Sequence, residues 1–302
     1  MIESRKKKIL LFGANGQVGW QLRRSLAPVG ELIVCSRDDV DIENFDLLRK
    51  AIKQYKPNII VNATAYTNVD MAETEQDKAE KINATAVRIM AEEAKNLSAL
   101  LVHYSTDYVF DGNSSKAYLE SDQTSPISVY GKTKLLGEEH IINSGCAYLI
   151  FRTSWVYSSR RKNFIKTIVS LAKEKEQLKV VSDQLGSPTS ADYIADVTAL
   201  CLSRGINKNE YGIYNLTTDG LISWFDLAKF LIELLRNNGV EIKVPSSNII
   251  PVKTDDSNFV VKRPKFSKLD SKKLKTVFGI NIPSWQHHVK YLLEDVKNNN
   301  FL

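Results

Sequence analysis

The chain has 302 residues, of which 43% are hydrophobic and 25% are charged, and it carries a formal net charge of +6. This length and composition are typical of a globular protein with one large or two modest domains. The basic residues are scattered rather than arranged in a stripe with aromatic residues, which disfavours nucleic-acid binding but leaves room for an anionic small molecule.

The cysteines and apolar runs bear on the compartment. Cys35, Cys146 and Cys201 are widely spaced and form no Cys-x-x-Cys motif, which favours reduced thiols over disulfides or a zinc site. The apolar run after the basic residues 5–8 stops at Gly13 and is too short for a signal peptide. The sequence contains no run of about eighteen apolar residues, so we expect no membrane-spanning helix. We therefore expect a cytoplasmic protein with no membrane partner and no metal site.

A strand, a glycine-rich turn and a helix follow one another near the N-terminus. Residues 9–12 predict a buried strand, and residues 20–26 have helical periodicity. The turn between them is built on Gly13, Gly16 and Gly19, which would let the backbone approach a pyrophosphate closely beside the free N–H groups of the helix start. This order predicts a dinucleotide site, although the glycine spacing alone also fits a structural turn.

The second predicted strand, residues 31–35, runs into Ser36 and Arg37. An acidic residue at such a strand end binds the ribose hydroxyls of NAD, whereas an arginine suits the 2′-phosphate of NADP. Ser36 and Arg37 therefore favour NADPH, while the neighbouring Asp38 and Asp39 leave NADH possible. Arg37 also fits a solvated loop charge. Asp41 is placed to cap the next helix, which is predicted over residues 45–55.

Strands and helices continue to alternate up to residue 104. Residues 59–61 predict a strand that ends in small and polar residues at 62–67, over which a cofactor can lie flat. Helices are expected over 69–73 and 78–96, and a fourth strand over 100–104. The alternation predicts an α/β fold with a doubly wound, Rossmann-type parallel sheet that binds ligands at the carboxyl ends of its strands.

Thr106, Tyr130 and Lys134 are the candidate chemical groups. Tyr130 and Lys134 are four residues apart in a helix predicted to run to about residue 143, so they share a face. A nearby ammonium lowers the pKa of a phenol, which would let Tyr130 exchange a proton with an oxygen near neutral pH. Thr106 follows the fourth strand and could hydrogen-bond a carbonyl beside Tyr130. A solvated helix face and a turn hydroxyl are the plainer interpretations.

The second half of the chain is less regular. Strands are predicted over 147–151, 178–181 and 213–216, and helices over 163–173, 192–202, 223–237, 271–278 and 285–297, with Ser223 as one helix cap. Residues 183–189 are interpreted as a loop and residues 245–251 as irregular. We expect a dinucleotide-binding domain over 1–160. Residues 161–302 would form mainly a smaller, mixed α/β substrate-binding lobe, with some segments returning to the sheet.

Seven segments spread over nearly the whole chain resemble the dTDP-4-dehydrorhamnose reductases, a family of extended short-chain dehydrogenases. In order they are GANGQVGWQLRRSLAPVGEL, VNATAYTNVDMAE, HYSTDYVFDG, SPISVYGKTKLLGE, FRTSWVY, DQLGSPT and RPKFSKLD. The resemblance implies the NAD(P)H-dependent reduction of the C4 ketone of dTDP-4-dehydro-L-rhamnose to dTDP-L-rhamnose, a sugar for a surface polysaccharide.

The resemblance also implies roles for single residues. Thr106, Tyr130 and Lys134 would be catalytic, with Tyr130 as the proton donor and Lys134 holding the nicotinamide ribose. The cofactor would bind to Tyr130 and Lys134 and to Gly13, Gly16, Gln17, Val18, Gly19, Ser36, Arg37, Asp41, Ile42, Ala65, Tyr66 and Thr67. The dTDP-sugar would bind to Val69, Thr106, Asp107, Trp155 and Arg263.

The chain departs from the family at two positions. Some members have an acidic residue where Ser36 stands, so strict use of NADH is not expected. Some have a glutamate at the position of Gln21, in a magnesium-linked dimer interface. Asp192 and Asp295 lie near the other acidic positions, but a carboxamide is a poor Mg²⁺ ligand. We expect no metal-bridged dimer and leave Mg²⁺ and a homodimer open.

Three alternatives remain at this point. The chain could reduce another dTDP-4-keto-6-deoxyhexose, because stereochemistry depends on pocket geometry. It could be a nucleotide-sugar 4,6-dehydratase, but those enzymes place Asp-Glu after the threonine, and here Asp107 is followed by Tyr108. It could also be a non-catalytic regulatory subunit of methionine adenosyltransferase, which need not keep Thr106, Tyr130 and Lys134.

Overall fold

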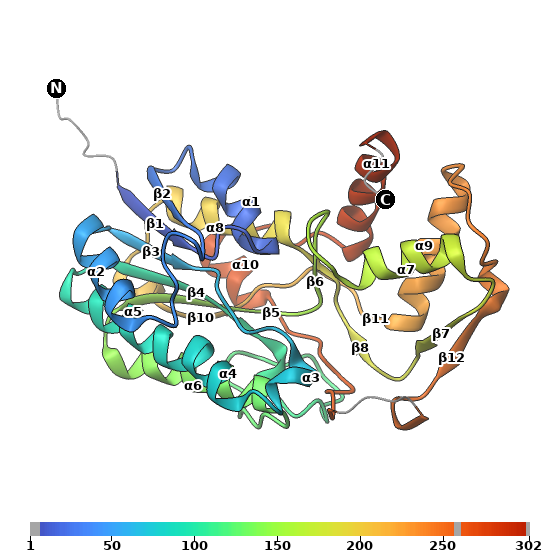
Figure 1. The fold of residues 1–302 in the computed structure, drawn as a ribbon, viewed down its shortest axis with the longest axis horizontal. Helices are drawn as coiled ribbons and strands as arrows, with labels where there is room; N and C mark the ends of the chain where they lie inside the picture. The colour runs from blue at the N-terminus through green and yellow to red at the C-terminus, as the bar shows by residue number, and fades with distance from the viewer. Residues whose placement is uncertain (1–6, 257–260, 300–302) are drawn as a thin grey trace.

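The computed structural model describes residues 7–256 and 261–299. A six-stranded, fully parallel sheet runs in the order β2-β1-β3-β4-β5-β10 (Figure 1). Its strands are β1 (Lys8–Phe12), β2 (Glu31–Cys35), β3 (Ile59–Asn62), β4 (Leu100–Thr106), β5 (Ala147–Thr153) and β10 (Gly212–Asn215). The strand order reverses between β1 and β3, and ligands of doubly wound sheets bind at such a switch point.

Alternating side chains of each strand pack on helices on the two faces. Ile9 and Leu11 face one core, and Leu10 and Phe12 face the other, as the two-residue period of a strand requires. The first face is covered by α1 (Gln17–Leu26), α8 (Ala191–Ser203) and α10 (Lys272–Phe278). The second is covered by α2 (Phe45–Tyr55), α5 (Ala86–Asn96) and α6 (Val129–Ser144). The α/β class and the doubly wound sheet are thus confirmed.

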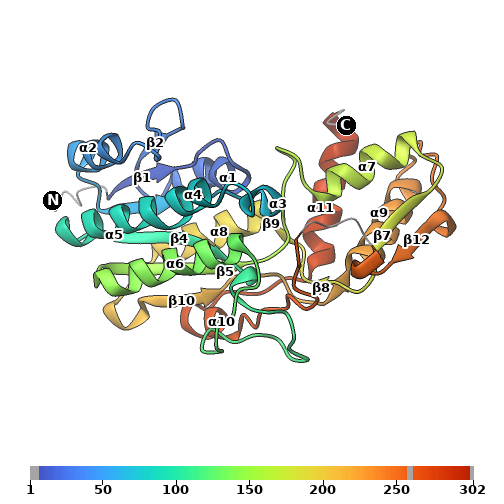
Figure 2. The same cartoon turned by 60° about the horizontal axis from the view of Figure 1, so that its bottom comes forward.

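A smaller lobe lies beyond the carboxyl ends of the strands and has its own apolar core (Figures 1 and 2). Its helices are α7 (Phe164–Glu174), α9 (Trp224–Asn237) and α11 (Trp285–Asn299). Strand β7 (Leu178–Val181) pairs in parallel with β12 (Ile249–Val252). Two more short pairs join β6 (Val156–Tyr157) to β9 (Thr189–Ser190) and β8 (Leu185–Gly186) to β11 (Ile222–Ser223).

Short helical elements complete the chain. Between β3 and α5 lie α3 (Val69–Ala72), α4 (Gln76–Glu80) and the π-helical turn η1 (Lys81–Thr85). The 3₁₀ turns are η2 (Asp107–Val109), η3 (Lys208–Glu210), η4 (Ser246–Asn248) and η5 (Thr254–Asp256). In the described part of the chain no helix is long and apolar enough to cross a membrane.

Four local predictions were wrong. The helix expected over 78–96 begins at Gln76 and is interrupted by the π turn η1. Asp41 does not cap α2; the side chain of Asn44 does, by accepting the N–H of Leu47 at 3.1 Å. The irregular segment 245–251 contains most of β12, and the loop 183–189 contains β8. These strands are short and lie outside the main sheet, so no long apolar run marks them.

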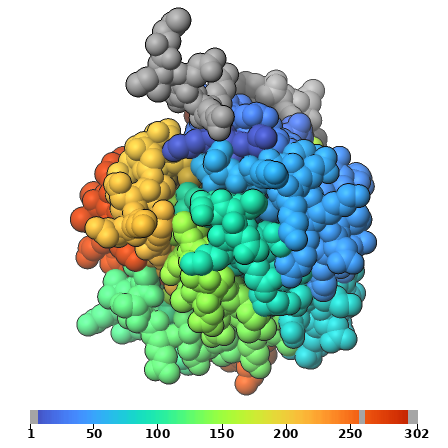
Figure 3. Space-filling model, turned by 90° about the vertical axis from the view of Figure 1, so that its left-hand side faces the viewer, coloured from blue at the N-terminus to red at the C-terminus, as the bar shows by residue number. Residues whose placement is uncertain are grey.

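Strand β10 pairs with β5 although it comes from the second half of the chain. Figure 3 views the end of the molecule where the strands begin, and residues near 210 lie there beside the N-terminal half. The domain boundary near residue 160 remains a prediction. The basic run from Arg5 falls partly outside the described residues, as does the side chain of Asp295.

Candidate active site

Two neighbouring cavities lie at the carboxyl ends of the central strands. The first, of about 450 Å³, lies between the turn after β1 and the segments after β2 and β3. We call it the turn cavity. Seven predicted cofactor residues line it, namely Gly13, Gly16, Ser36, Arg37, Asp41, Ile42 and Ala65. The second, of about 360 Å³, lies between the ends of β4 and β5 and the smaller lobe. We call it the tyrosine cavity. Its lining includes the predicted residues Gln17, Thr67, Val69, Thr106, Asp107, Tyr130, Trp155 and Arg263.

Four predicted residues line neither cavity: Val18, Gly19, Tyr66 and Lys134. Val18 and Gly19 lie inside α1 behind the turn. Tyr66 is held from both ends, because its N–H donates to Asn83 and its hydroxyl donates to Glu75. Lys134 is turned into the interior, where its side chain is almost fully buried.

The glycine turn fits a dinucleotide. Gly13 has a φ of +79°, and a Cβ there would lie 2.6 Å from the Ala63 carbonyl group. A Cβ on Gly19 would lie 2.1 Å from the Gly13 carbonyl oxygen, so glycine is needed for α1 to approach the turn. The α1 N-terminus starts at Gly16 without a side-chain cap, which leaves its first N–H groups and the positive end of the helix dipole for a phosphate.

The groups predicted to read the ribose of the cofactor are paired with acidic residues. The backbone N–H and the hydroxyl of Ser36 both donate to one carboxylate oxygen of Asp39, at 2.8 and 2.7 Å. These bonds, the backbone one first, lower the pKa of Asp39. The Arg37 guanidinium donates to Glu43 at 2.8 Å and also lies 3.9 Å from Asp41. Ser36 and Arg37 thus both line the turn cavity, and each donates a hydrogen bond to an acidic residue at most six positions further along the chain.

Tyr130 is partly buried and lies beside the buried Thr106 and Asp107. Burial raises the pKa of Tyr130 to about 12; contact with the Thr106 hydroxyl opposes this rise and the Asp107 carboxylate adds to it. Thr106 donates to Asp107 at 3.0 Å and accepts the N–H of Tyr108, so it is both a turn cap and a cavity group. The expectation of a lowered phenol pKa is therefore wrong for this arrangement. A phenol with a pKa near 12 carries its proton throughout the neutral range and suits a proton donor.

Asp107 is the most unusual carboxyl group of the tyrosine cavity. Its side chain is buried, and burial raises its pKa to about 6, against opposing hydrogen bonds from Ser267 and Thr106. Because this pKa is about 6, the Asp107 carboxyl group can be neutral or ionised close to the pH at which the protein works. The next residue, Tyr108, has its ring edge-on to that of Tyr130, with 5.5 Å between the ring centroids.

Lys134 contacts β4 rather than the phenol. Its Nζ donates to the Tyr104 carbonyl oxygen at 2.6 Å and lies 3.1 Å from His103 Nε2. Burial lowers the pKa of Lys134 to about 8, against the opposing charge of Glu138. The predicted ammonium–phenol influence is absent from the causes that shift Tyr130. Lys134 and Tyr130 are one helical turn apart, but of the two only Tyr130 lines the tyrosine cavity.

Trp155 and Arg263 connect the tyrosine cavity to the smaller lobe. The Trp155 indole stacks on Trp224 with ring centroids 3.4 Å apart, and its backbone has a φ of +49°. A Cβ on Gly186 would lie 2.5 Å from that indole, so the loop must approach Trp155 closely. Arg263 donates to Asp70 at 2.9 Å, next to the predicted Val69. These contacts place an aromatic face on the lobe side of the tyrosine cavity and a cation beside α3.

Sequence reasoning missed several residues here. Arg161 lines the turn cavity and donates to the Asn15 carbonyl oxygen at 3.1 Å. Asn163 donates to the side chain of Gln17 at 3.0 Å and so orients it. The basic run 160–162 directly after the Trp155 segment was an available signal for Arg161. No short motif joins Asn163 to Gln17, because 146 residues separate them.

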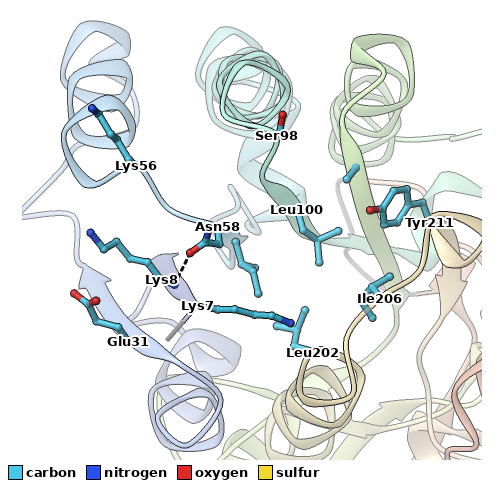
Figure 4. Close-up of a pocket in the computed structure, with 12 residues that line it drawn as sticks. Lys7, Lys8, Glu31, Lys56, Asn58, Ser98, Leu100, Leu202, Ile206 and Tyr211 are labelled. Atoms are coloured by element: carbon cyan, nitrogen blue, oxygen red, sulfur yellow. Dashed lines mark hydrogen bonds between the residues drawn. The ribbon is translucent and has the colours of Figure 1, made fainter. Parts of the chain in front are cut away.

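A third cavity, of about 660 Å³, lies at the opposite end of the sheet (Figure 4). Lys7, Lys8, Lys56 and Glu31 line it, and the Lys8 N–H donates to Asn58 at 2.9 Å. None of the predicted site residues is there. Although this cavity is larger, parallel sheets bind ligands at the carboxyl ends of their strands, and the buried groups with shifted pKa values are at that end.

Within residues 7–256 and 261–299, no group of three or more His, Cys, Asp or Glu side chains is placed to hold a metal ion.

Nearly the whole chain matches known proteins. A family profile described as the RmlD substrate binding domain matches residues 7–298. The dTDP-4-dehydrorhamnose reductase of Escherichia coli K12 is 43% identical over 293 residues, covering 95% of this chain and 97% of that protein. The chain belongs to the dTDP-4-dehydrorhamnose reductase family. It is therefore an oxidoreductase, and the non-catalytic alternative is excluded.

Other members agree in sequence and structure. The dTDP-4-dehydrorhamnose reductase of Burkholderia thailandensis is 41% identical over 294 residues, which cover 96% of this chain and 99% of that one. The crystal structure of the Bacillus anthracis dTDP-4-dehydrorhamnose reductase in complex with NADP superposes with a TM-score of 0.88. That protein is 33% identical, and the match covers 96% of this chain and 99% of that one. The resemblance seen in the sequence is confirmed.

Proposed function

We propose that the enzyme reduces the C4 ketone of dTDP-4-dehydro-L-rhamnose to give dTDP-L-rhamnose, with NADPH as the preferred hydride donor. The observation that carries this proposal is the tyrosine cavity, where Gln17 from the glycine turn lies together with Thr106 and Tyr130. A nicotinamide cofactor, when bound, supplies the hydride. This grouping supports the proposal, because a sugar ketone bound in the tyrosine cavity would have these hydroxyls near the oxygen that needs a proton.

The chain's own groups would act on that oxygen in sequence. The Thr106 hydroxyl, already near Tyr130, hydrogen-bonds the ketone oxygen and orients it. The Tyr130 hydroxyl gives its proton as negative charge develops there, because its raised pKa keeps it protonated beforehand. Lys134, which contacts β4 in this structure, would have to turn toward the nicotinamide ribose to hold it, and when charged it would stabilise the phenolate that remains. Solvent then returns the proton to Tyr130.

The lobe side of the tyrosine cavity would hold the nucleotide sugar. Arg263 offers a planar cation to the diphosphate, and its hydrogen bond to Asp70 orients it. Trp155, supported by Trp224 and Gly186, forms an aromatic wall against which a sugar ring can pack. Val69 and Asp107 complete the wall.

The direct test is reduction of the substrate. The purified protein is mixed with dTDP-4-dehydrorhamnose and either NADPH or NADH, and absorbance of the reduced nicotinamide is followed. We expect oxidation of both cofactors with higher kcat/KM for NADPH. No oxidation of either one would contradict the proposed function. NMR of the product separates rhamnose from another 6-deoxyhexose, which is the alternative that remains.

Cofactor preference rests on Arg37. Its guanidinium faces the turn cavity and is held by Glu43, so a 2′-phosphate would have to share or take over that cation. The NADP complex of the Bacillus anthracis relative supports NADPH for this family. In Arg37→Ala we expect the ratio of kcat/KM for NADPH over NADH to fall. An unchanged ratio would remove Arg37 from this role. That no magnesium ion bridges a dimer of this chain also stays a prediction.

A further inference from the structure

A buried chain of hydrogen bonds connects Lys134 to the turn cavity. Lys134 Nζ lies 3.1 Å from His103 Nε2, and His103 Nδ1 lies 3.1 Å from Asn62 Nδ2. Asn62 Oδ1 accepts the backbone N–H of Thr64 at 3.0 Å, and Thr64 lines the turn cavity. His103, Asn62 and Lys134 are each at most 1% exposed. The chain therefore lies in the protein interior, where donors and acceptors have to match.

The direction of each hydrogen bond follows from one fixed donor. A backbone N–H can only donate, so the Asn62 atom facing Thr64 must be the carbonyl oxygen. The other end of that amide is then the NH₂ group, which donates to His103 Nδ1. Nδ1 must therefore carry a lone pair, which excludes the imidazolium and leaves the only ring proton of His103 on Nε2.

The His103 Nε2–H group points at Lys134, and this decides the form of the amine. An ammonium has three donors and no acceptor, so it would set a donor against a donor across 3.1 Å. A neutral amine has a lone pair for Nε2–H and keeps a proton to donate to the Tyr104 carbonyl oxygen. We infer that Asn62 and His103 are positioning residues that hold Lys134 as a neutral amine.

The surrounding charges agree with this inference. Burial lowers the pKa of His103 well below its ordinary value, which keeps the ring neutral, and burial lowers the pKa of Lys134 to about 8, so this amine is mostly neutral at about pH 9. The carboxylate facing Lys134 is Glu138, on the same helix, and Arg152 of β5 binds it at 2.6 Å. Tyr130, one turn earlier, stays protonated.

The consequence concerns when the lysine becomes useful for catalysis. A neutral amine does not stabilise the phenolate of Tyr130. To do so, Lys134 must take up one proton from solvent, release His103 Nε2–H and turn toward other acceptors, such as the two hydroxyls of a nicotinamide ribose. Binding of the cofactor and charging of Lys134 are then one event. This consequence rests on the proposed function, whereas the neutral amine rests on the hydrogen-bond directions alone.

The first experiment needs no cofactor. Protein labelled with ¹³C and ¹⁵N in lysine and histidine is studied by NMR at about pH 9, above the pKa of Lys134 and below that of ordinary lysines. Lys134→Met and His103→Gln assign the signals. We expect a neutral-amine signal for Lys134 and an Nε2–H tautomer for His103. An Nδ1–H tautomer, or an ammonium signal for Lys134, would overturn the inference.

A nearly isosteric variant reverses the chain. In Asn62→Asp, the carboxylate accepts from both Thr64 and His103, which moves the ring proton to Nδ1 and leaves Nε2 to accept from the Lys134 ammonium. We expect the tautomer to switch and the Lys134 signal to become that of an ammonium. Asn113→Asp, on an exposed loop, is the matched control and should change neither signal. A folded Asn62→Asp protein that keeps the wild-type tautomer would contradict the inference.

Calorimetry tests the coupled proton uptake. NADPH is titrated into the protein at about pH 9 in two buffers of different ionisation enthalpy, since the difference in heat gives the protons taken up. We expect close to one proton for wild type and for the control His140→Gln, and far less for Asn62→Asp. Binding with equal heats in both buffers would overturn the coupling. No binding at all would instead count against the proposed function, and the NMR result would still decide the form of Lys134.

Discussion

The turn cavity and the tyrosine cavity are neighbours, but they are assembled in different ways. Except for Ile82 and Arg161, the turn cavity is lined by residues 12–65, and its polar groups are paired within a few residues, as in Ser36 with Asp39. The tyrosine cavity takes residues from 17 to 263, with Thr106 and Asp107 buried and Tyr130 partly buried. Exposed pairs between near neighbours change the free energy of folding little, whereas burial shifts pKa values strongly. The first cavity is suited to choosing a ligand and the second to proton transfer.

Removing the phenol should have the largest effect. In Tyr130→Phe the proton donor is lost while the turn cavity is untouched, so we expect kcat to fall by about a hundredfold or more and the Kd for NADPH to change far less, since Tyr130 is one of many residues expected to bind the cofactor. Steady-state kinetics and a cofactor titration measure the two quantities. Tyr148→Phe, near the start of β5, is the matched control. Full activity in Tyr130→Phe would break the assignment of chemistry to the tyrosine cavity.

Asp107 should make stability depend on pH. Its folded pKa of about 6 lies above that of an unfolded aspartate, so the unfolded chain loses this proton first as pH rises. Stability should therefore fall between about pH 4 and pH 6 by about 3 kcal/mol and level off above.

Asp107→Asn tests this by imitating the protonated acid, so it should lack that slope. Urea unfolding of both proteins at about pH 4 and pH 7 measures it. The same difference in unfolding free energy at both values would show that burial does not act on this carboxyl group as described.

Arg263 tests the substrate side. In Arg263→Gln the cation is lost, and we expect the KM for the nucleotide sugar to rise about tenfold while kcat changes little, because a charge-assisted hydrogen bond to a diphosphate is worth roughly that much. The matched control is Arg236→Gln, on α9, whose side chain donates to the Val244 carbonyl oxygen. A fall in kcat at constant KM would place Arg263 in the chemistry instead.

Asp39 should have the smallest effect. Its carboxylate occupies both donors of Ser36 and would repel a 2′-phosphate. In Asp39→Asn we expect the ratio of kcat/KM for NADPH over NADH to rise about fivefold, as suits an exposed charge. Asp46→Asn, in the first turn of α2, is the control for loss of charge. A fall in the ratio would mean that Asp39 assists NADPH.

Local signals in the sequence predicted the sheet well. Strand β2, strand β7 and helix α2 have the predicted bounds, and Ser223 caps α9 as expected. Short apolar runs, glycine turns and caps act over a few residues, so they are visible in the chain. The π turn η1 was missed because tertiary packing sets it: its Asn83 contacts Thr133 of α6 at 3.1 Å.

The sequence predicted where the site lies better than it predicted the charges and pKa values of its side chains. Thr106 and Tyr130 could be placed because strand ends and one helix face bring them to the same edge. The direction of the Lys134 side chain could not, because it depends on His103 and Asn62, and 41 residues separate those two. The roles assigned to the single residues remain predictions until variants are measured.

The pairing of β10 with β5 has a consequence for synthesis on the ribosome. Strand β5 ends at Thr153, but its partner is complete only at Asn215. At about 5–20 residues per second, the β5 edge waits roughly 3–12 seconds for its neighbour. An unpaired, apolar edge of this kind attracts other nascent chains. The growing polypeptide is therefore most exposed to aggregation after strands β1 to β5 have formed and before β10, the last strand of the main sheet, arrives.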